Sequence, residues 1–130
     1  MIYREFYSEL GKLLYAVADI DGMISKAEKK KLQEIVEKEL APMEKRKDKF
    51  GTNVSSYSET EFEILDEEIG DAEAAFESFI NFTEEHRTAF DAKLKMVCLR
   101  VAKELAAAYQ GTNKKEKELI GRLKKTLDSL

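Results

Sequence analysis

The stretch Ala18-Asp19-Ile20-Asp21-Gly22-Met23-Ile24-Ser25-Lys26-Ala27-Glu28 separates two amphipathic segments and decides how the chain folds. Upstream of it, apolar residues recur every three or four positions, at Tyr3, Phe6, Leu10, Leu13, Leu14 and Val17. Downstream, the same spacing is repeated by Leu32, Ile35, Val36, Leu40 and Met43. A period near 3.6 residues is typical of an amphipathic helix, so we expect helices over residues 2–19 and 26–41. Pro42 disfavours helical geometry in the residue before it, so the second helix should end or kink there.

Within this stretch, the local signals favour a chain reversal followed by a new helix. Gly22 supplies the backbone freedom that a tight reversal needs. Ser25, with Glu28 three residues later, matches a capping box, in which each side chain bonds a backbone N–H at the start of a helix. The two amphipathic segments are therefore predicted to form a helical hairpin.

Similar start and stop signals divide the remainder of the chain into further helices. In order, they are Ser58 with Glu61, Gly70, Asp71, Thr83, Gly111, and Asn113 with Glu116. Residues 50–57 are rich in Gly, Thr, Asn and Ser and are predicted to form a loop. The sequence thus predicts an all-α bundle of six or seven helices, with residues 1–130 forming a single domain.

The first hairpin recurs weakly at the end of the chain. A helix, a glycine turn, a capping residue with Glu three positions later, and a second helix describe residues 6–43 and again residues 94–130. This similarity predicts two pseudo-repeated helical hairpins. The acids of the first turn are not repeated, because Tyr109-Gln110-Gly111-Thr112 stands where Ile20-Asp21-Gly22-Met23 stands in the first copy.

The pattern Ala18-x-x-Asp21-Gly22-x-Ile24-Ser25-x-x-Glu28, preceded by Leu14-Tyr15-Ala16-Val17-Ala18, resembles the TerB family. These small all-helical bacterial domains are associated with tellurite resistance and are also found fused to J-domain co-chaperones. The resemblance implies an internally duplicated helical fold. It also implies a non-enzymatic role in a tellurite-type or metal-type stress response, exerted through protein contacts.

Composition favours a globular protein of a reducing compartment. The 130 residues are 37% charged and 43% hydrophobic, which suits one helix-rich core. The single cysteine, Cys98, has no partner for an internal disulfide. The N-terminus lacks the pattern of a signal peptide, and no apolar run approaches the length of a membrane span. We therefore expect a cytoplasmic protein without a membrane-spanning segment.

The net charge of −4 conceals a strong segregation. Residues 51–85 contain eleven acidic residues and no Lys or Arg, whereas residues 87–130 contain eleven basic and five acidic residues. In one interpretation, the acidic Ser58–Glu77 region faces the basic C-terminal part within the fold or is simply solvated. In the other, it is a binding surface for a partner.

Asp19, Asp21 and Glu28 are the candidate metal-binding residues. The two aspartates lie at the end of a predicted helix, where the helix dipole disfavours negative charge, and carboxylates are ligands that hard cations such as Ca²⁺ or Mg²⁺ prefer. Spaced as in an EF-hand loop, they would place Val17, which cannot bind metal, at the first position. The other interpretation is structural: Asp21 shapes the turn, Glu28 completes the capping box and the start of the second helix neutralises Asp19.

No catalytic pattern accompanies these residues, so we do not expect an enzyme. His86 is the only histidine, and Thr83 stands where a Glu-x-x-His motif would need its Glu. There is no Gly-rich phosphate loop, and the clustered lysines are interleaved with Glu, which argues against nucleic-acid binding. The leading hypothesis is a TerB-like domain that contacts an unidentified protein partner, with a divalent cation as its candidate cofactor. The alternative is a helical interaction scaffold with no metal role, and the sequence does not determine the oligomeric state in either case.

Overall fold

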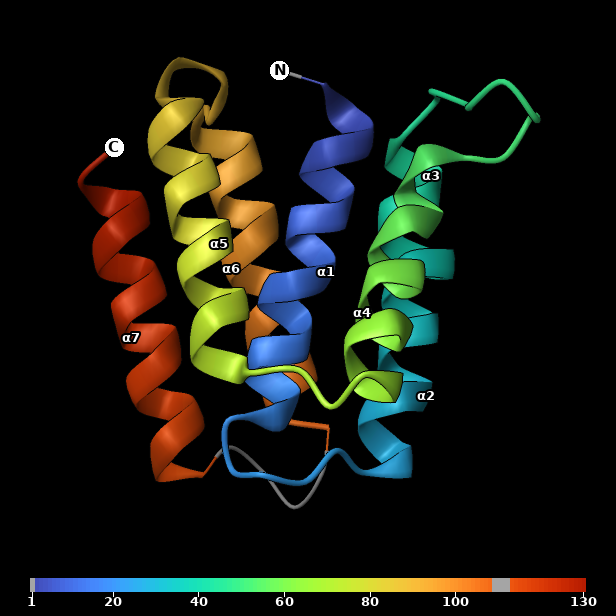
Figure 1. Cartoon of the computed structure of the whole chain (residues 1–130). Helices are drawn as coiled ribbons and strands as arrows, with labels where there is room; N and C mark the ends of the chain where they lie inside the picture. The colour runs from blue at the N-terminus through green and yellow to red at the C-terminus, as the bar shows by residue number, and fades with distance from the viewer. Residues whose placement is uncertain (1, 109–112) are drawn as a thin grey trace.

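The computed structural model of the chain describes residues 2–108 and 113–130, and within them it is an all-α bundle without a β-strand (Figure 1). The helices are α1 (Tyr3–Asp19), α2 (Lys26–Ile35), α3 (Ala41–Met43), α4 (Tyr57–Glu67), α5 (Ala72–Glu85), α6 (Ala92–Ala106) and α7 (Lys114–Asp128). A π-helical turn, Val36–Leu40, joins α2 to α3, and single 3₁₀ turns, Val54–Ser56 and Arg87–Ala89, precede α4 and follow α5. Since α2, the π-helical turn and α3 run on without a break, these residues form six helices, and the predicted fold class is confirmed.

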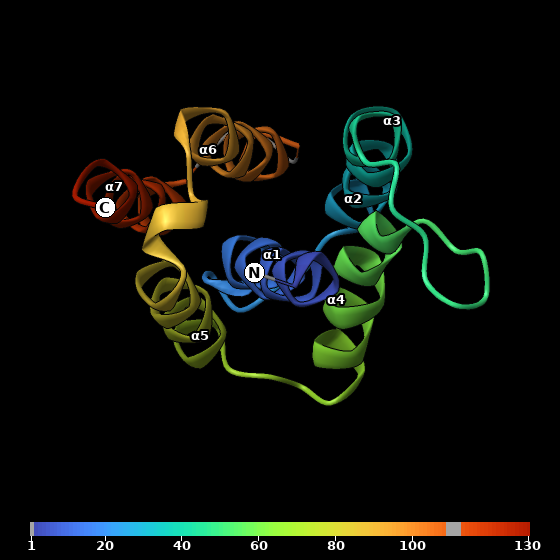
Figure 2. The ribbon, with the colours of Figure 1, turned by 90° about the horizontal axis from the view of Figure 1, so that it is seen from above.

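Helix α1 is the centre of the bundle, and the longer helices stand around it (Figure 2). Only its first turn keeps an exposed polar face, at Arg4 and Glu5. From Leu13 to Ala18 every residue is buried, so the helix predicted as amphipathic is apolar all round in its second half. Such a helix is stable only when other elements cover every side.

Helix α4 approaches α1 closely at Gly11. A Cβ atom at Gly11 would lie 2.4 Å from the carbonyl oxygen of Ser58, so only glycine permits this approach. Ser58 itself is buried, and its hydroxyl donates a hydrogen bond to the carbonyl of Tyr7 in α1 (2.6 Å). The predicted capping box at Ser58 is therefore wrong. Helix α4 begins at Tyr57, and the Ser58 hydroxyl serves the contact between two helices.

The predicted helix start at Thr83 is also wrong, because α5 continues through it to Glu85. The Thr83 hydroxyl donates to the carbonyl of Ile80 in the preceding turn (2.7 Å), which a mid-helix threonine can do. The next long helix, α6, begins only at Ala92, where the Asp91 carboxylate accepts a hydrogen bond from the backbone N–H of Leu94 (2.8 Å). It ends at Ala106, and the predicted stop at Gly111 lies outside the described residues.

Pro42 is accommodated by a change of helix type. The backbone N–H of Ala41 donates to the carbonyl of Val36, five residues earlier, which is the π-helical pattern. A proline in a regular α-helix would collide with the carbonyl four residues before it. The wider turn relieves this contact, so the helix passes the proline and ends at Met43 rather than at Ala41.

Helix α4 ends in a left-handed residue, and that residue is Ile69 rather than the predicted Gly70. Ile69 has φ 53°, and its side chain is 89% exposed. The N–H of Gly70 donates to the carbonyl of Leu65 (2.8 Å), and the N–H of Ile69 donates to that of Asp66 (3.4 Å). This is a Schellman ending with isoleucine at the position that glycine normally occupies. Asp71 then caps α5 as predicted, accepting from the N–H of Ala74 (3.1 Å).

The turn after α1 and the start of α7 meet at one end of the bundle. Both capping boxes form, one between Ser25 and Glu28 and the other between Asn113 and Glu116. Gly22 reverses the first turn with φ 89°. The glycine turn of the second hairpin, residues 109–112, lies outside the described residues. None of the described helices has both the length and the apolar composition needed to cross a lipid bilayer.

Candidate functional site

The three acids of the first turn each have a separate structural partner. Asp19, at the end of α1, accepts a hydrogen bond from the Tyr15 hydroxyl (3.1 Å), which also contacts the carbonyl of Gly70 (2.8 Å). Burial raises the pKa of Asp19; the bond from Tyr15 opposes this shift, and the neighbouring charge of Asp21 adds to it. Among the described residues, the side-chain hydrogen bond to Asp19 comes from Tyr15 of its own helix rather than from the start of α2.

Asp21 shapes the turn and joins it to the second hairpin. One carboxylate oxygen, Oδ1, accepts from the backbone N–H of Met23 (3.2 Å), which closes an Asx turn. The other, Oδ2, accepts from the side-chain amide of Asn113 (2.9 Å). Asn113 is the N-cap of α7, so one carboxylate links the reversal after α1 to the start of the last helix.

Glu28 completes the capping box that the sequence predicts. Its Oε1 accepts from the backbone N–H and the hydroxyl of Ser25 (2.9 and 3.0 Å), and its own N–H donates to that hydroxyl (3.1 Å). Burial raises the pKa of Glu28, and the charges of Asp21 and Asp19 add to the effect. Sequence reasoning missed a fourth acid here, Glu116, which is also buried and whose pKa is raised by burial and by the Glu28 charge. The second capping box was the signal that could have placed it.

These four acids influence one another through charge, but they do not form a group of metal ligands. Among the described residues, no three His, Cys, Asp or Glu side chains are arranged so that they could hold a metal ion. The structural interpretation of Asp21 and Glu28 has its hydrogen bonds, whereas the metal-binding interpretation of Asp19, Asp21 and Glu28 has no ligand group in this arrangement.

The acidic Ser58–Glu77 region divides between two helices with different surroundings. On α5, Glu73 and Glu77 face Arg122 of α7, with Arg122 nitrogens 2.9 and 3.4 Å from their carboxylates. The Arg122 guanidinium also lies over the ring of Phe76, 4.7 Å from its centroid. This half of the acidic region therefore faces the basic C-terminal part, as one of the two interpretations predicts.

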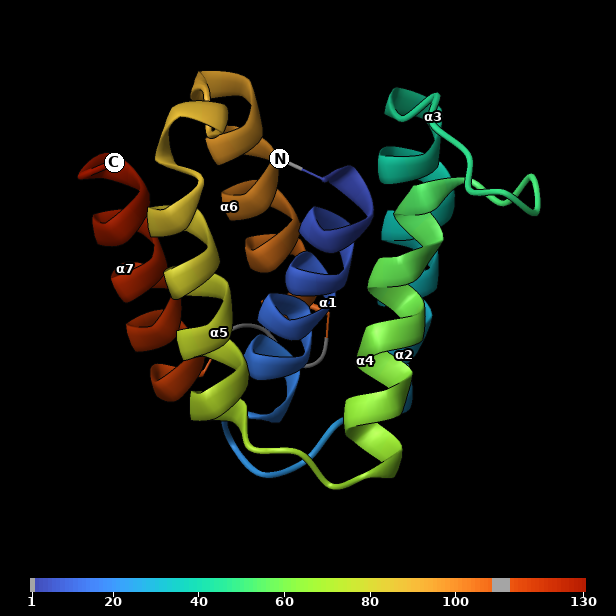
Figure 3. The ribbon, with the colours of Figure 1, turned by 45° about the horizontal axis from the view of Figure 1, so that its top comes forward.

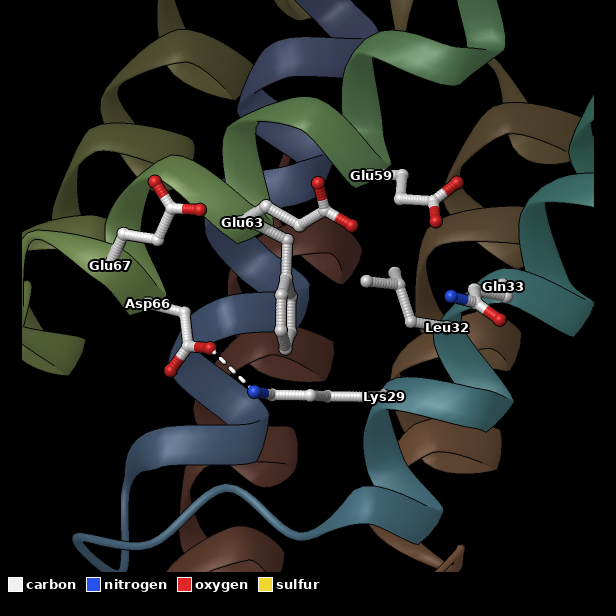
Figure 4. A pocket seen from close by; sticks show the side chains of 8 residues that line it. Lys29, Leu32, Gln33, Glu59, Glu63, Asp66 and Glu67 are labelled. Atoms are coloured by element: carbon white, nitrogen blue, oxygen red, sulfur yellow. Dashed lines mark ion pairs between the residues drawn. The ribbon is translucent and has the colours of Figure 1, made fainter.

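On α4, the acids line a groove instead. The groove lies between α2 and α4, has a volume of about 370 Å³, and has the buried side chains of Leu32 and Phe62 beneath it (Figure 4). Its polar lining is Lys29, Gln33, Glu59, Glu63, Asp66 and Glu67. We call this the α2–α4 groove.

The charges of the α2–α4 groove are unbalanced. Lys29 pairs with Asp66 (2.9 Å), and this bond raises the pKa of the lysine. Within the described parts of the chain, Glu59, Glu63 and Glu67 form no ion pair. Burial raises the pKa of Glu59, and the charges of Glu63 and Glu37 raise it further. Lys29 also senses the charge of Glu63, which raises its pKa further, but no base in the described residues forms an ion pair with the three glutamates. The groove therefore presents three carboxylates without ion pairs over an apolar base, which suits a cationic ligand.

The spacing of these glutamates was a signal that the sequence offered. Glu59, Glu63 and Glu67 are four residues apart, so a helix places them on one face. What the sequence did not give was the neighbour of that face. Which of the two acidic helices lies beside the basic C-terminal helix is decided by how all of them pack around α1.

Comparison of the chain with known protein families, with curated proteins and with solved structures finds no match. The likeness to TerB domains therefore rests on the motif around Asp21 and Gly22.

Proposed function

We propose that this protein is a non-enzymatic helical interaction module whose α2–α4 groove binds a cationic segment of a partner protein. The observation that carries the proposal is the row Glu59, Glu63 and Glu67, which lines the groove without forming an ion pair among the described residues. Like charges four residues apart on a helix destabilise it by about 0.2–0.5 kcal/mol per pair. The fold gains nothing from this row, which supports a role in binding.

The expected ligand is an amphipathic helix or an extended segment that carries Lys or Arg. Lysines four residues apart on a helix repeat at the same interval as the glutamates, and an apolar residue between them could lie over Leu32 and Phe62. The TerB resemblance supplies the setting of the proposal: a bacterial cytoplasmic stress response of the tellurite or metal type, exerted through protein contacts. Its support is the Asp-Gly motif alone.

The test is binding of a fluorescent helical peptide with lysines at three positions four residues apart and leucines between them. Glu59→Gln with Glu63→Gln should weaken binding about tenfold, because two charge pairs are lost. The matched control is Glu73→Gln with Glu77→Gln, which removes an equally spaced pair from α5 and should leave affinity nearly unchanged. Equal losses in both double variants would mean that the peptide responds to net charge and would contradict the groove as its site.

The proposal needs no cation at the Asp-Gly turn. A cation that bound only the folded state would raise stability by RT ln(1 + [L]/Kd). We expect millimolar Ca²⁺ or Mg²⁺ to leave the melting temperature equal to that in chelator. A rise that Asp21→Asn abolishes would instead establish the metal site of Asp19, Asp21 and Glu28, with the cation as part of the function.

A further inference from the structure

A second surface, at the opposite end of α4 from Ile69, carries the complementary charge. The segment 44–53 leaves the bundle after α3 and projects as a loop beside the start of α4 (Figures 1 and 3). Phe50, in this loop, is 79% exposed, and Ile2, near the start of α1, is 57% exposed. With Arg4, Lys47 and Lys49 they line a hollow of about 500 Å³. We call these five residues the basic loop surface.

The loop that carries this surface is held by its own hydrogen bonds. The Asp48 carboxylate accepts from the N–H groups of Phe50 and Thr52 and from the Tyr57 hydroxyl (2.8, 3.0 and 2.9 Å). The Asn53 amide donates to the carbonyl of Glu44 (2.7 Å). These hydrogen bonds hold the loop in a conformation that leaves the Phe50 side chain exposed to solvent.

Buried contacts fix the base of the loop. Glu44 accepts hydrogen bonds from the Tyr7 hydroxyl (3.0 Å) and from the backbone and side chain of Arg46 (2.9 and 3.0 Å). Burial alone would raise the pKa of Glu44, but these bonds outweigh it and lower the pKa. The Arg46 guanidinium lies over the Tyr3 ring, 3.6 Å from its centroid. Arg46 is thus used in the fold, and the cations left for a partner are others.

The cations left are Arg4, Lys47 and Lys49, and of these Arg4 acts on Asp48: the hydrogen bond from the Thr52 N–H lowers the pKa of that carboxyl, and the Arg4 charge lowers it further. In the described ranges, Arg4, Lys47 and Lys49 form no ion pair. The one acid that lines the hollow is Asp48, and its oxygens are taken by the loop. The surface is therefore a set of cations around an exposed aromatic ring. The α2–α4 groove is a set of carboxylates above two apolar side chains.

We propose that the basic loop surface of one copy docks into the α2–α4 groove of a second copy. Phe50 enters above Leu32 and Phe62, and Lys47 and Lys49 lie against the glutamates of α4. The loop and the groove both belong to the side of the bundle formed by α2 and α4 (Figures 1 and 2). A two-fold rotation can therefore match each loop with the other copy's groove and close the assembly as a dimer. This inference rests on the proposed function and names the partner.

An anionic membrane is the competing occupant of the loop, and the charges next to the loop argue against it. The acidic face of α4 begins at Glu59, only nine residues after Phe50. Pressing Phe50 into an anionic bilayer would bring these carboxylates toward lipid phosphates. In the dimer the same carboxylates receive the lysines of the other copy, so both charged surfaces are neutralised together.

The test is the oligomeric state of charge-reversed variants, measured by sedimentation velocity at low ionic strength. Lys47→Glu with Lys49→Glu should be monomeric, because an acidic loop then meets an acidic groove. Glu59→Lys with Glu63→Lys should be monomeric for the converse reason. An equimolar mixture of the two variants should form a dimer, since both of its loop–groove contacts join opposite charges. Wild-type protein should dimerise, and moderate salt should weaken its self-association about tenfold.

Two further variants separate docking from general charge effects. Glu84→Lys with Glu85→Lys, at the exposed end of α5, changes the net charge by the same amount as Glu59→Lys with Glu63→Lys. This control should leave the dimer intact. Phe50→Ser removes an exposed ring without altering charge and should weaken the dimer. Helical content by circular dichroism checks that each variant is folded.

Wild-type protein that stays monomeric at high concentration and low salt, or a mixture that stays monomeric, would overturn the dimer. Binding of the lysine peptide to Lys47→Glu with Lys49→Glu, whose groove is intact, tests the proposed function separately. Should monomeric wild-type protein co-sediment with phosphatidylserine vesicles, and lose this binding on Phe50→Ser, the loop would be a membrane-contact site and the proposed dimer would be wrong.

Discussion

Helices α4 and α5 are both strongly acidic and both pack against α1, yet their acids differ in whether a neighbouring helix pairs with them. Beside α5 stands α7, whose Arg122 pairs with Glu73 and Glu77. Beside α4 stands α2, whose Lys29 forms an ion pair with Asp66 but, among the described residues, with no other acid of α4. The acidity of a segment therefore does not say whether its charge is paired inside the fold. The neighbouring helix decides this, and the neighbour is set by how each helix fits α1.

The largest effect should come from breaking the fit of α4 on α1. Gly11→Ala places a Cβ atom 2.4 Å from the carbonyl oxygen of Ser58, so the helices must separate. We expect a loss of about 2–3 kcal/mol in the free energy of unfolding, because overpacking of this kind outweighs the better helix propensity of alanine. Urea denaturation measures it. Gly121→Ala on α7, where a Cβ would meet nothing within 4 Å, is the control and should be neutral or stabilising. An unchanged midpoint for Gly11→Ala would refute the close contact.

A like-charge contact between α6 and the π-helical turn should make the stability of the fold depend on pH. Glu104 of α6 lies beside Glu39 of the π-helical turn, and Arg100 contacts both carboxylates (3.9 and 3.3 Å). Burial and the neighbouring Glu39 raise the pKa of Glu104 to about 7. Because the pKa of Glu104 in the folded protein lies above the ordinary glutamate value of 4.5, the folded state gains from protonation of Glu104. This stability is fully present below pH 4.5 and is lost as the pH rises through about 7.

Stability should therefore increase when the pH is lowered from 8 toward 5, and Glu104→Gln should reduce this dependence. At pH 8 the variant should be more stable than wild type by about 1 kcal/mol, a value reduced for the partial exposure of the pair. Thermal melts at several pH values provide the measurement. If the stability of the variant depended on pH as strongly as that of wild type, Glu104 would not be the group responsible.

A smaller effect should follow from removing Arg122, which pairs with two acids of α5. Arg122→Ala leaves Glu73 and Glu77 without a partner and exposes Phe76, so we expect a loss of about 1 kcal/mol or less, diminishing at high salt. Lys124→Ala is the control, since Lys124 pairs only with Asp128 within α7 among the described residues. If the two variants melt alike at low salt, the acids of α5 would be as unused as those of α4.

The smallest effect concerns how α4 ends. Ile69→Gly relieves a left-handed backbone that a β-branched residue rarely adopts, and little packing is lost because the side chain is almost fully exposed. Glycine also gives the unfolded chain more freedom, so the net gain should be only about 0.5 kcal/mol. Calorimetry can resolve this shift. A destabilised variant would mean that the Ile69 side chain contributes contacts that its exposure does not suggest.

How far the sequence could predict this fold depended on the range of each signal. The capping boxes at Ser25 and Asn113 were correct because both partners lie within one turn of the helix. Ser58 and Thr83 carry the same kind of hydroxyl, but one bonds to α1 and the other to its own helix. The sequence alone does not indicate which acceptor a hydroxyl will bond to, because that depends on which helices pack together. The left-handed conformation of Ile69 was not predicted, because the adjacent Gly70 is the residue type normally found at a left-handed helix end.

The candidate site was less accessible to sequence reasoning than the fold. The metal-binding hypothesis followed from three carboxylates close in sequence, yet Tyr15, Asn113 and Ser25 each take one of them. Two of these partners lie in the same hairpin, and the third comes from the far end of the chain. The α2–α4 groove has the reverse character, because its glutamates were visible as a row while the helix facing them was not.

Cys98 gives the protein an internal reporter. The thiol is fully buried on α6, and burial raises its pKa far above the ordinary value for a thiol. A thiol reagent added to the folded protein must wait for the bundle to open, because the thiolate that reacts is neither exposed nor formed. The chain has no other cysteine, so the labelling rate measures the opening of its core without any engineered probe.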